Sequence, residues 1–247
     1  MLSRTLRKVV AVGAAFSALA LTAVPAAASG DYITTTGGSD ISWPQCGKPL
    51  PPIDPRSFGI VGVNGGQTFT MNPCFKQEWD WMQAGGAAKA SVYINLDFGT
   101  TSDGYNQCAT DNTFCTAYDY GYLAAEYAYT RANYESNGAS LKAVTWWLDV
   151  ETASDWSDDQ ATNARVVEGA MDYLKTTGKH IGVYSTRGQW NEITGGWNPG
   201  AGIGNWVAGA DDLNDFALCT ANIWDGAPVW VFQYLNFDLD LDQDRSC

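Results

Sequence analysis

Ala143-Val144-Thr145-Trp146-Trp147-Leu148-Asp149-Val150-Glu151 is the segment of this chain that decides its fold. Side chains alternate along a strand, so one face of the segment carries Thr145, Trp147, Asp149 and Glu151 and the other carries only apolar residues. The apolar face must pack against helices, and the mixed face therefore points inward. It ends with two acids at the carboxyl end of the strand, where β/α barrels build their active sites.

Short apolar segments alternate with helical ones on both sides of this strand, which is typical of β/α units with a parallel sheet. The expected helices run from Asn72-Pro73 to about Ala84, over 118–137, and from a capping box at 157–160 to Gly178. The rhythm then changes, and the last segments are strand-like with little helix between them. The expected strands cover 39–43, 58–63, 90–96, 143–151, 180–185, 205–208, 229–234 and 237–242. We predict a TIM-like β/α barrel of five β/α units followed by three strands, with helices missing from one side.

Residues 1–28 have the order of an export signal. Basic residues precede an apolar run from Val9 to Val24, and small residues end at Ala28. The run is shorter than a bilayer span, so we expect cleavage after Ala28, a secreted extracellular protein without a membrane anchor, and one barrel domain over 29–247.

Charge narrows the choice of partners. Without the signal the chain has 11 basic and 27 acidic residues, a formal charge of −16. Such a surface repels nucleic acid and anionic lipid. We expect a monomer whose partner is a polysaccharide substrate.

The cysteines form an even set in an exported chain, which favours disulfides over a metal site. Six cysteines allow fifteen pairings. Proximity favours Cys108 with Cys115, and elimination then leaves Cys46 with Cys74 and Cys219 with Cys247. With His180 as the only histidine, we expect no zinc site and no cofactor.

Asp149 and Glu151 predict a particular chemistry. Acids two residues apart on one face cannot both ionise freely, so the pKa of one is raised. A glycosidase needs one protonated acid for the leaving oxygen and one carboxylate to stabilise positive charge on the sugar. The alternative is that Asp149 caps the next helix and Glu151 is a solvated loop residue.

Acids at the two ends of the chain support the catalytic interpretation. Asp40 points inward from the first strand, and Asp238, Asp240 and Asp242 share one face of the last strand. First and last strands are neighbours in a closed barrel, so these acids can converge with the central pair. The alternative for the last group is a loose calcium site or an exposed acidic edge.

Other chemistries lack their residues. His180 lies at the start of a strand, the wrong end of a barrel for a Ser-His-Asp site, and Gly65-Gly66 is too short for a phosphate loop. Aromatic rings can stack on sugars, and Tyr93, Tyr184 and Trp206 are the candidates for the cleft.

Several segments in matching order resemble the family 25 glycoside hydrolases, which are lysozymes that cut peptidoglycan. The segments are Asp40-Ile41-Ser42-Trp43, Trp147-Leu148-Asp149-Val150-Glu151, Gly182-Val183-Tyr184-Ser185, Trp206-Val207-Ala208 and Phe232-Gln233-Tyr234, with an aspartate in the last strand. The resemblance implies a barrel of five β/α units and three strands.

The resemblance also implies roles. Glu151 would be the general acid, and Asp149 would stabilise an intermediate formed with the substrate's acetamido group. Asp40 would line the cleft with Asp240, or Asp242 in its place, and Gln233 would contact substrate. We therefore expect a secreted, lysozyme-like glycan hydrolase, the alternative being an inactive barrel that binds glycan or protein.

The chain departs from the family pattern in two strands. Val63-Asn64-Gly65-Gly66 stands where a lysine-rich, acid-containing segment is usual, and Tyr93-Ile94-Asn95-Leu96 replaces an aromatic-histidine pair. The walls that contact the substrate are therefore expected to differ.

Overall fold

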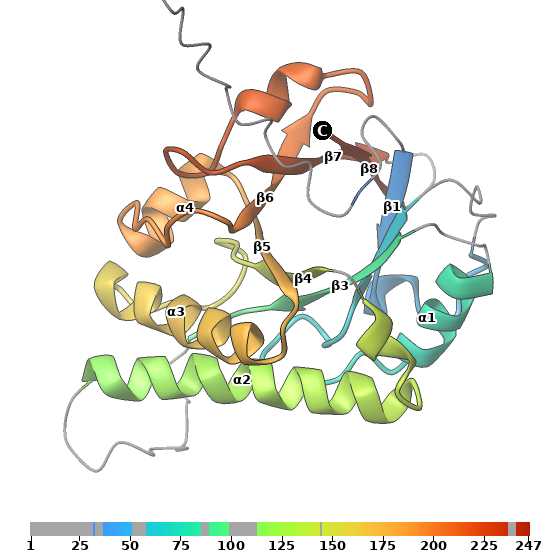
Figure 1. Ribbon diagram of the computed structural model, residues 1–247, viewed down its shortest axis with the longest axis horizontal. Coiled ribbons are helices and arrows are strands. Elements are labelled where there is room, and N and C mark those ends of the chain that lie inside the picture. Colours follow the sequence, from blue (N-terminus) through green and yellow to red (C-terminus); the bar gives the residue numbers. More distant parts are fainter. Residues whose placement is uncertain are drawn as a thin grey trace, which may run out of the picture.

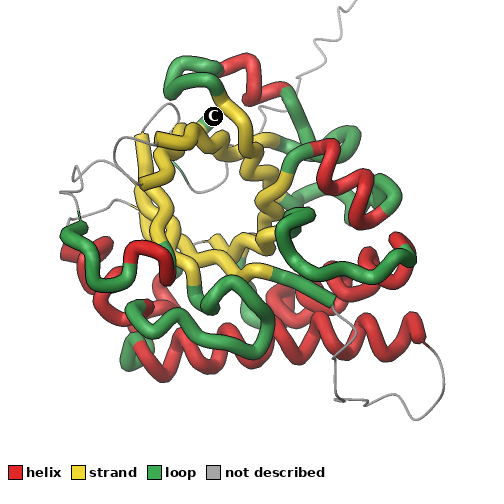
Figure 2. Tube along the Cα trace, turned by 180° about the vertical axis from the view of Figure 1, so that it is seen from behind, coloured by secondary structure: helices red, strands yellow, loops and turns green. Residues whose placement is uncertain are grey.

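Eight strands close into a barrel in which each strand pairs with the next and β8 returns to β1. The computed structural model describes residues 32, 37–50, 58–84, 89–98, 113–143, 145–236 and 241–247. Figure 2 shows the strands as a closed ring with the helices outside it. The strands are β1 (Gly37–Ile41), β2 (Phe58–Gly62), β3 (Lys89–Asn95), β4 (Thr145–Asp149), β5 (His180–Ser185), β6 (Gly204–Ala210), β7 (Val229–Asn236) and β8 (Leu241–Ser246).

Seven strands run in one direction and the eighth runs against them. β1 to β7 pair in parallel, and β8 pairs antiparallel with both β7 and β1. The carboxyl ends of β1 to β7 therefore meet at one mouth, and β8 begins at that mouth. The predicted TIM-like barrel is confirmed.

Helices lie outside the ring on several sides: α2 and α3 along the lower part of Figure 1, α4 at the left and α1 at the lower right. An α-helix follows each strand from β2 to β5, whereas β1 and β6 are followed in the described residues by 3₁₀ turns. The helices are α1 (Phe75–Ala84), α2 (Thr113–Glu135), α3 (Gln160–Thr176) and α4 (Arg187–Thr194), and the 3₁₀ turns are η1 (Trp43–Gln45), η2 (Ala139–Lys142) and η3 (Phe216–Thr220). In the part of the chain that the structure describes, no helix is long and apolar enough to cross a bilayer.

α2 and α3 pack closely because glycines remove side chains at their crossing. A Cβ at Gly121 would lie 1.8 Å from the carbonyl oxygen of Val166, and one at Gly169 would lie 2.0 Å from that of Tyr118. Only glycine permits this approach of the two backbones.

The alternation predicted for the central strand is confirmed. Trp146, Leu148 and Val150 belong to the core between strands and helices, and Trp147 belongs to a separate cluster inside the barrel. Ile41 likewise faces the outer core, which leaves Asp40 on the inner face of β1.

Two boundaries differ from the prediction. The last strand covers Leu241–Ser246 instead of 237–242, and residues 237–240 lie outside the described residues. α3 begins at Gln160 with Asp159 as its N-cap, whose carboxylate accepts from the amides of Ala161 and Thr162. Ser157 instead donates through its hydroxyl to the side chain of Asn163, 2.7 Å away.

Two disulfides link loops near the first and the last strands of the barrel. Cys46–Cys74 joins the end of η1 to the residue before α1, and Cys219–Cys247 joins η3 to the last residue of the chain. Both predicted pairs are confirmed. The third, Cys108 with Cys115, falls outside the described residues because Cys108 and the Cys115 side chain are not described.

Candidate active site

Asp149 and Glu151 lie at the mouth of the barrel. Asp149 is the last residue of β4, in register with Asn95 of β3 and Tyr184 of β5, and only 5% of it is exposed. Glu151 follows two residues later and is half-buried, so it is the more accessible of the two acids. One acid thus reaches solvent while its neighbour is enclosed.

Acids from β1 and β8 lie across the barrel from this pair. Asp40 is in register with Asp242, and Asp244 lies deeper, where β8 passes Gln233 of β7. Asp40 and Asp244 are buried, and Asp242 is half-buried. The three side chains therefore bring carboxyl groups into the same interior as Asp149.

Polar side chains from β5, β6 and β7 hold the buried acids. The Tyr184 hydroxyl donates to Gln233 Oε1 at 2.6 Å, and Gln233 Nε2 donates to Asp40 Oδ2 at 2.9 Å. The Trp206 indole donates to Asp244 Oδ1 at 2.8 Å. These bonds orient Asp40 and Asp244 before any ligand binds.

Burial and mutual repulsion keep protons on this group. Burial, reinforced by the charge of Asp242, raises the pKa of Asp40 to about 8. Burial and the neighbouring Glu151 raise the pKa of Asp149 well above its usual value, and burial with the charge of Asp40 does the same for Asp244.

The pKa of Glu151 is raised as well, first by burial, although a hydrogen bond from Gln189 opposes the shift. Asp149 and Glu151 interact directly and therefore titrate as one pair. Such a pair retains a proton at a pH where two separate carboxyl groups would be ionised.

Comparison with known proteins points to one family. The model of the lysozyme-like protein 1 family matches residues 116–208, from α2 to β6. A probable GH family 25 lysozyme 4 of Dictyostelium discoideum is 43% identical over 70 residues, 28% of this chain and 32% of that protein. The matched segment of this chain is therefore similar to GH25 lysozymes. It matches about a third of the length of the curated relatives.

Solved structures of a muramidase and of an endolysin share the barrel fold of this chain. A muramidase from Trichobolus zukalii superposes with a TM-score of 0.57 at 16% identity, over 86% of this chain and 93% of that one. The modular Cpl-1 endolysin, solved with a peptidoglycan analogue, superposes with a TM-score of 0.54 at 14% identity, over 86% of this chain and 54% of that one.

The structure places most of the predicted site residues together. Asp40, Asp149, Glu151, Tyr184 and Gln233 converge, whereas Asp238 and Asp240 lie outside the described residues.

The aromatic candidates differ in how far they reach the site surface. Tyr93 is half-buried, while Trp206 is 2% exposed and lies among the rings inside the barrel. Trp206 therefore supports the floor of the site instead of offering a ring face to a sugar.

Asp244 was missed by the sequence prediction. The alternation of Phe237, Leu239 and Leu241 with acids predicted a last strand that ends at Asp242, before Asp244. The same alternation continues through Asp242 and Asp244 to Ser246, and this was the available signal. Among the described residues, no three His, Cys, Asp or Glu side chains are grouped to hold a metal ion.

Proposed function

We propose that this chain is a secreted glycosidase that cleaves N-acetylated cell-wall polysaccharide, with peptidoglycan as its substrate. The observation that carries the proposal is the Asp149–Glu151 pair at the carboxyl end of β4, enclosed by the acids of β1 and β8. A raised carboxyl pKa beside a second carboxylate is the requirement of acid-catalysed glycoside cleavage.

The geometry supports a division of roles within the pair. Glu151 is the more exposed acid, so it delivers the shared proton to the glycosidic oxygen as the carbon–oxygen bond breaks. Asp149 is left as a buried carboxylate and stabilises the positive charge that develops on the sugar and its acetamido group. Water then attacks the sugar carbon, and its proton returns to Glu151.

The remaining site residues form the cleft around this reaction. Asp40 and Asp242 line the side opposite the pair. The resemblance implies a role for Asp240, with Asp242 as the alternative, and we assign it to Asp242, which lies among the described acids. Tyr93 contacts the substrate, and the buried side chains of Tyr184 and Gln233 support the cleft through their hydrogen bonds to each other and to Asp40. The names of the related lysozymes and the peptidoglycan analogue held by the Cpl-1 endolysin support this substrate class.

Export completes the proposal. Residues 1–28 act as a signal peptide, and 29–247 form one domain that works as a monomer outside the cell without a membrane anchor. The two described disulfides suit an oxidising compartment. Tyr32, which follows soon after the proposed cleavage site, is buried among the rings inside the barrel.

Hydrolysis of purified peptidoglycan, with products identified by mass spectrometry, tests the function. Glu151→Gln should lower kcat about 1,000-fold because the amide cannot donate the catalytic proton. Glu168→Gln on α3 is the matched control and should retain full activity, since Glu168 pairs with Arg165 on the outside of the barrel. Retained activity in Glu151→Gln would remove that residue's role. Glycan binding by the wild type without any product would instead establish the inactive binding barrel.

A further inference from the structure

We propose that Asn95 is a positioning residue that selects which carboxyl oxygen of Asp149 takes part in the reaction, and that the buried amide of Asn64 holds Asn95 in place. The inference rests on the proposed function because Asp149 belongs to that site. It concerns residues in the two strands where the chain departs from the lysozyme pattern.

Asn95 acts directly on Asp149. It ends β3 in register with Asp149, and its Nδ2 donates a hydrogen bond to Asp149 Oδ2. Asp149 Oδ1 is buried without a donor among the described residues. The amide thus occupies one oxygen and leaves the other for the proton shared with Glu151. When the proton leaves, the Asn95 bond remains and stabilises the carboxylate.

Asn64 fixes the backbone of Asn95. The β2–β3 ladder continues past Gly62 with the bond from the Val63 amide to the Tyr93 carbonyl, 2.9 Å. Beyond this point the side chain of Asn64 makes the hydrogen bonds that the backbone of a neighbouring strand would otherwise make. Its Oδ1 accepts from the Asn95 amide at 3.0 Å, and its Nδ2 donates to the Asn95 carbonyl at 2.9 Å. Both backbone groups of Asn95 are therefore held by one side chain.

Both donors and the oxygen of the Asn64 amide are hydrogen-bonded in this arrangement. The second Nδ2 hydrogen bonds the Gln67 carbonyl at 2.9 Å, and the residue is 1% exposed. A buried amide held by three hydrogen bonds is rigid, and removing it leaves several groups unpaired. Asn64 thereby connects the loop after β2 to Asn95 at the end of β3, and Asn95 in turn bonds Asp149 at the end of β4.

Other ionisable groups also face Asp149 and set the background against which Asn95 acts. They come from the neighbouring elements: Asp40 on β1, Tyr93 on β3, Glu151 after β4 and Tyr184 on β5. Asp242 on β8 acts on Glu151 and Asp40. These groups are acidic or neutral, and the negative charges among them disfavour the ionised form of Asp149. Asn95 opposes this effect because it donates a hydrogen bond to the Asp149 carboxylate.

The test is Asn95→Leu, which keeps the volume but removes the donor, with Asn95→Ala as the replacement if the leucine variant does not fold. NMR titration of carboxyl carbons, with the Asp149 signal assigned from Asp149→Asn, should show the Asp149 midpoint raised by about one to two pH units. With peptidoglycan, kcat should fall about 10- to 100-fold while KM changes little. Asn95→Gln, which keeps the amide, should recover part of both effects.

Controls separate positioning from general stability and from the proposed function. Asn163→Ala removes another buried, hydrogen-bonded amide, on α3, and should lower the free energy of unfolding without moving the Asp149 midpoint. Asn64→Ala should lower kcat in the wild type but add nothing in the Asn95→Leu background. An unmoved Asp149 midpoint in Asn95→Leu overturns the inference. A moved midpoint in a protein that releases no sugar keeps the positioning role and rejects the glycosidase function.

Discussion

The two halves of the barrel interior are built from opposite materials. The half at the amino ends of the strands is filled by aromatic rings, with Tyr32 packed against Phe58 at 4.6 Å and stacked on Trp147 at 6.2 Å between ring centroids. The half at the mouth holds Asp40, Asp149 and Glu151. One half excludes water and stabilises the fold, while the other concentrates like charges at a cost in stability.

β4 belongs to both halves, and this explains how the barrel tolerates the acids. Trp147 and Asp149 are two residues apart on the same face. The ring of Trp147 makes edge contacts with Trp206 at 5.7 Å and Trp230 at 6.0 Å, so it is held from two sides. Trp206 sits at the boundary, with its ring among the aromatics and its indole nitrogen bonded to Asp244. The aromatic half thus provides the rigid floor on which the acids are held.

Trp147→Ala, in the aromatic half, should have the largest effect on stability. Trp147 is fully buried, so its truncation leaves a large cavity and should lower the free energy of unfolding by about 3–5 kcal/mol. Urea unfolding followed by circular dichroism measures the loss. Trp43→Ala is the matched control, because 48% of Trp43 is exposed and its loss should cost far less. Equal losses in the two variants would show that the aromatic half does not support the barrel.

Asp40→Asn, in the acidic half, should change how the free energy of unfolding depends on pH. Burial raises the pKa of Asp40 to about 8 in the folded protein, above its usual value of 3.8. A carboxyl group of this kind binds its proton more tightly in the folded state, so its stabilising effect is complete below about pH 4 and is lost as the pH rises towards 8. The variant should therefore be the more stable protein at pH 8, by about 2 kcal/mol, and show a flatter dependence on pH.

Unfolding free energies at pH 5 and pH 8 measure this difference. Asp159→Asn provides a control whose effect should be the same at these two pH values, since hydrogen bonds from Thr162 and Ala161 at the start of α3 lower the pKa of Asp159. Its contribution is present at neutral pH and is lost as the pH falls below its usual range. A wild-type protein whose stability rises from pH 5 to pH 8, with Asp40→Asn following the same curve, would contradict the burial of a protonated Asp40.

The positions of Trp147 and of the central acids could be predicted from the sequence for a simple reason. The wholly apolar face of β4 must pack against the helices, so its other face points into the barrel. The positions of Trp147 and Asp149 on that inner face then follow from alternation. The carboxyl end of a parallel strand then places Asp149 and Glu151 at the mouth. The same reasoning placed Asp40 on the inner face of β1.

The rest of the site depends on contacts that alternation does not encode. β8 is set by pairing with β7 and β1, and a shift along the chain keeps the acids alternating while changing which of them are enclosed. Asp244 escaped prediction for this reason. The role of Asn64 was equally hidden, because a side chain that replaces a strand has no periodic pattern.

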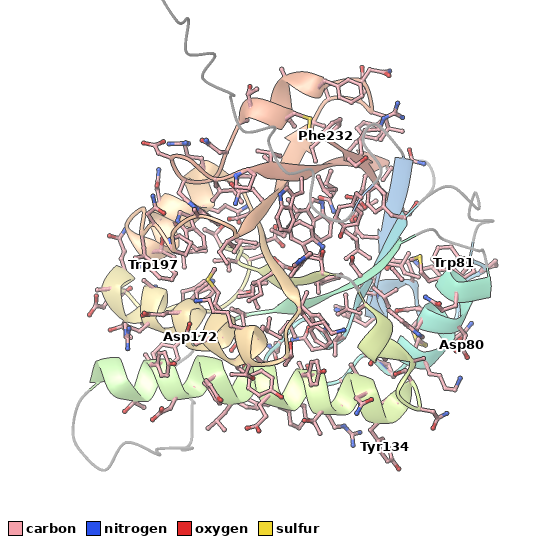
Figure 3. All side chains as sticks on the ribbon, viewed as in Figure 1. Asp80, Trp81, Tyr134, Asp172, Trp197 and Phe232 are labelled. Atoms are coloured by element: carbon pink, nitrogen blue, oxygen red, sulfur yellow. A yellow bond between two sulfur atoms is a disulfide. The ribbon has the colours of Figure 1, made fainter. Side chains whose placement is uncertain are left out.

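Tyr32→Phe is the smallest change that separates packing from hydrogen bonding in the aromatic half. The Tyr32 hydroxyl contacts Ser91 Oγ at 2.7 Å and accepts from the Trp147 indole at 2.9 Å. Phenylalanine keeps the ring contacts but leaves the buried Trp147 donor without this acceptor, so the free energy of unfolding should fall by about 1 kcal/mol with little change in activity. Tyr134→Phe is the matched control, since Tyr134 projects from the outer side of α2 and is 71% exposed (Figure 3). Differential scanning calorimetry compares the two variants directly. An equal Tm for Tyr32→Phe and the wild type would mean that ring packing, without the hydrogen bonds of the hydroxyl, stabilises the aromatic half of the barrel.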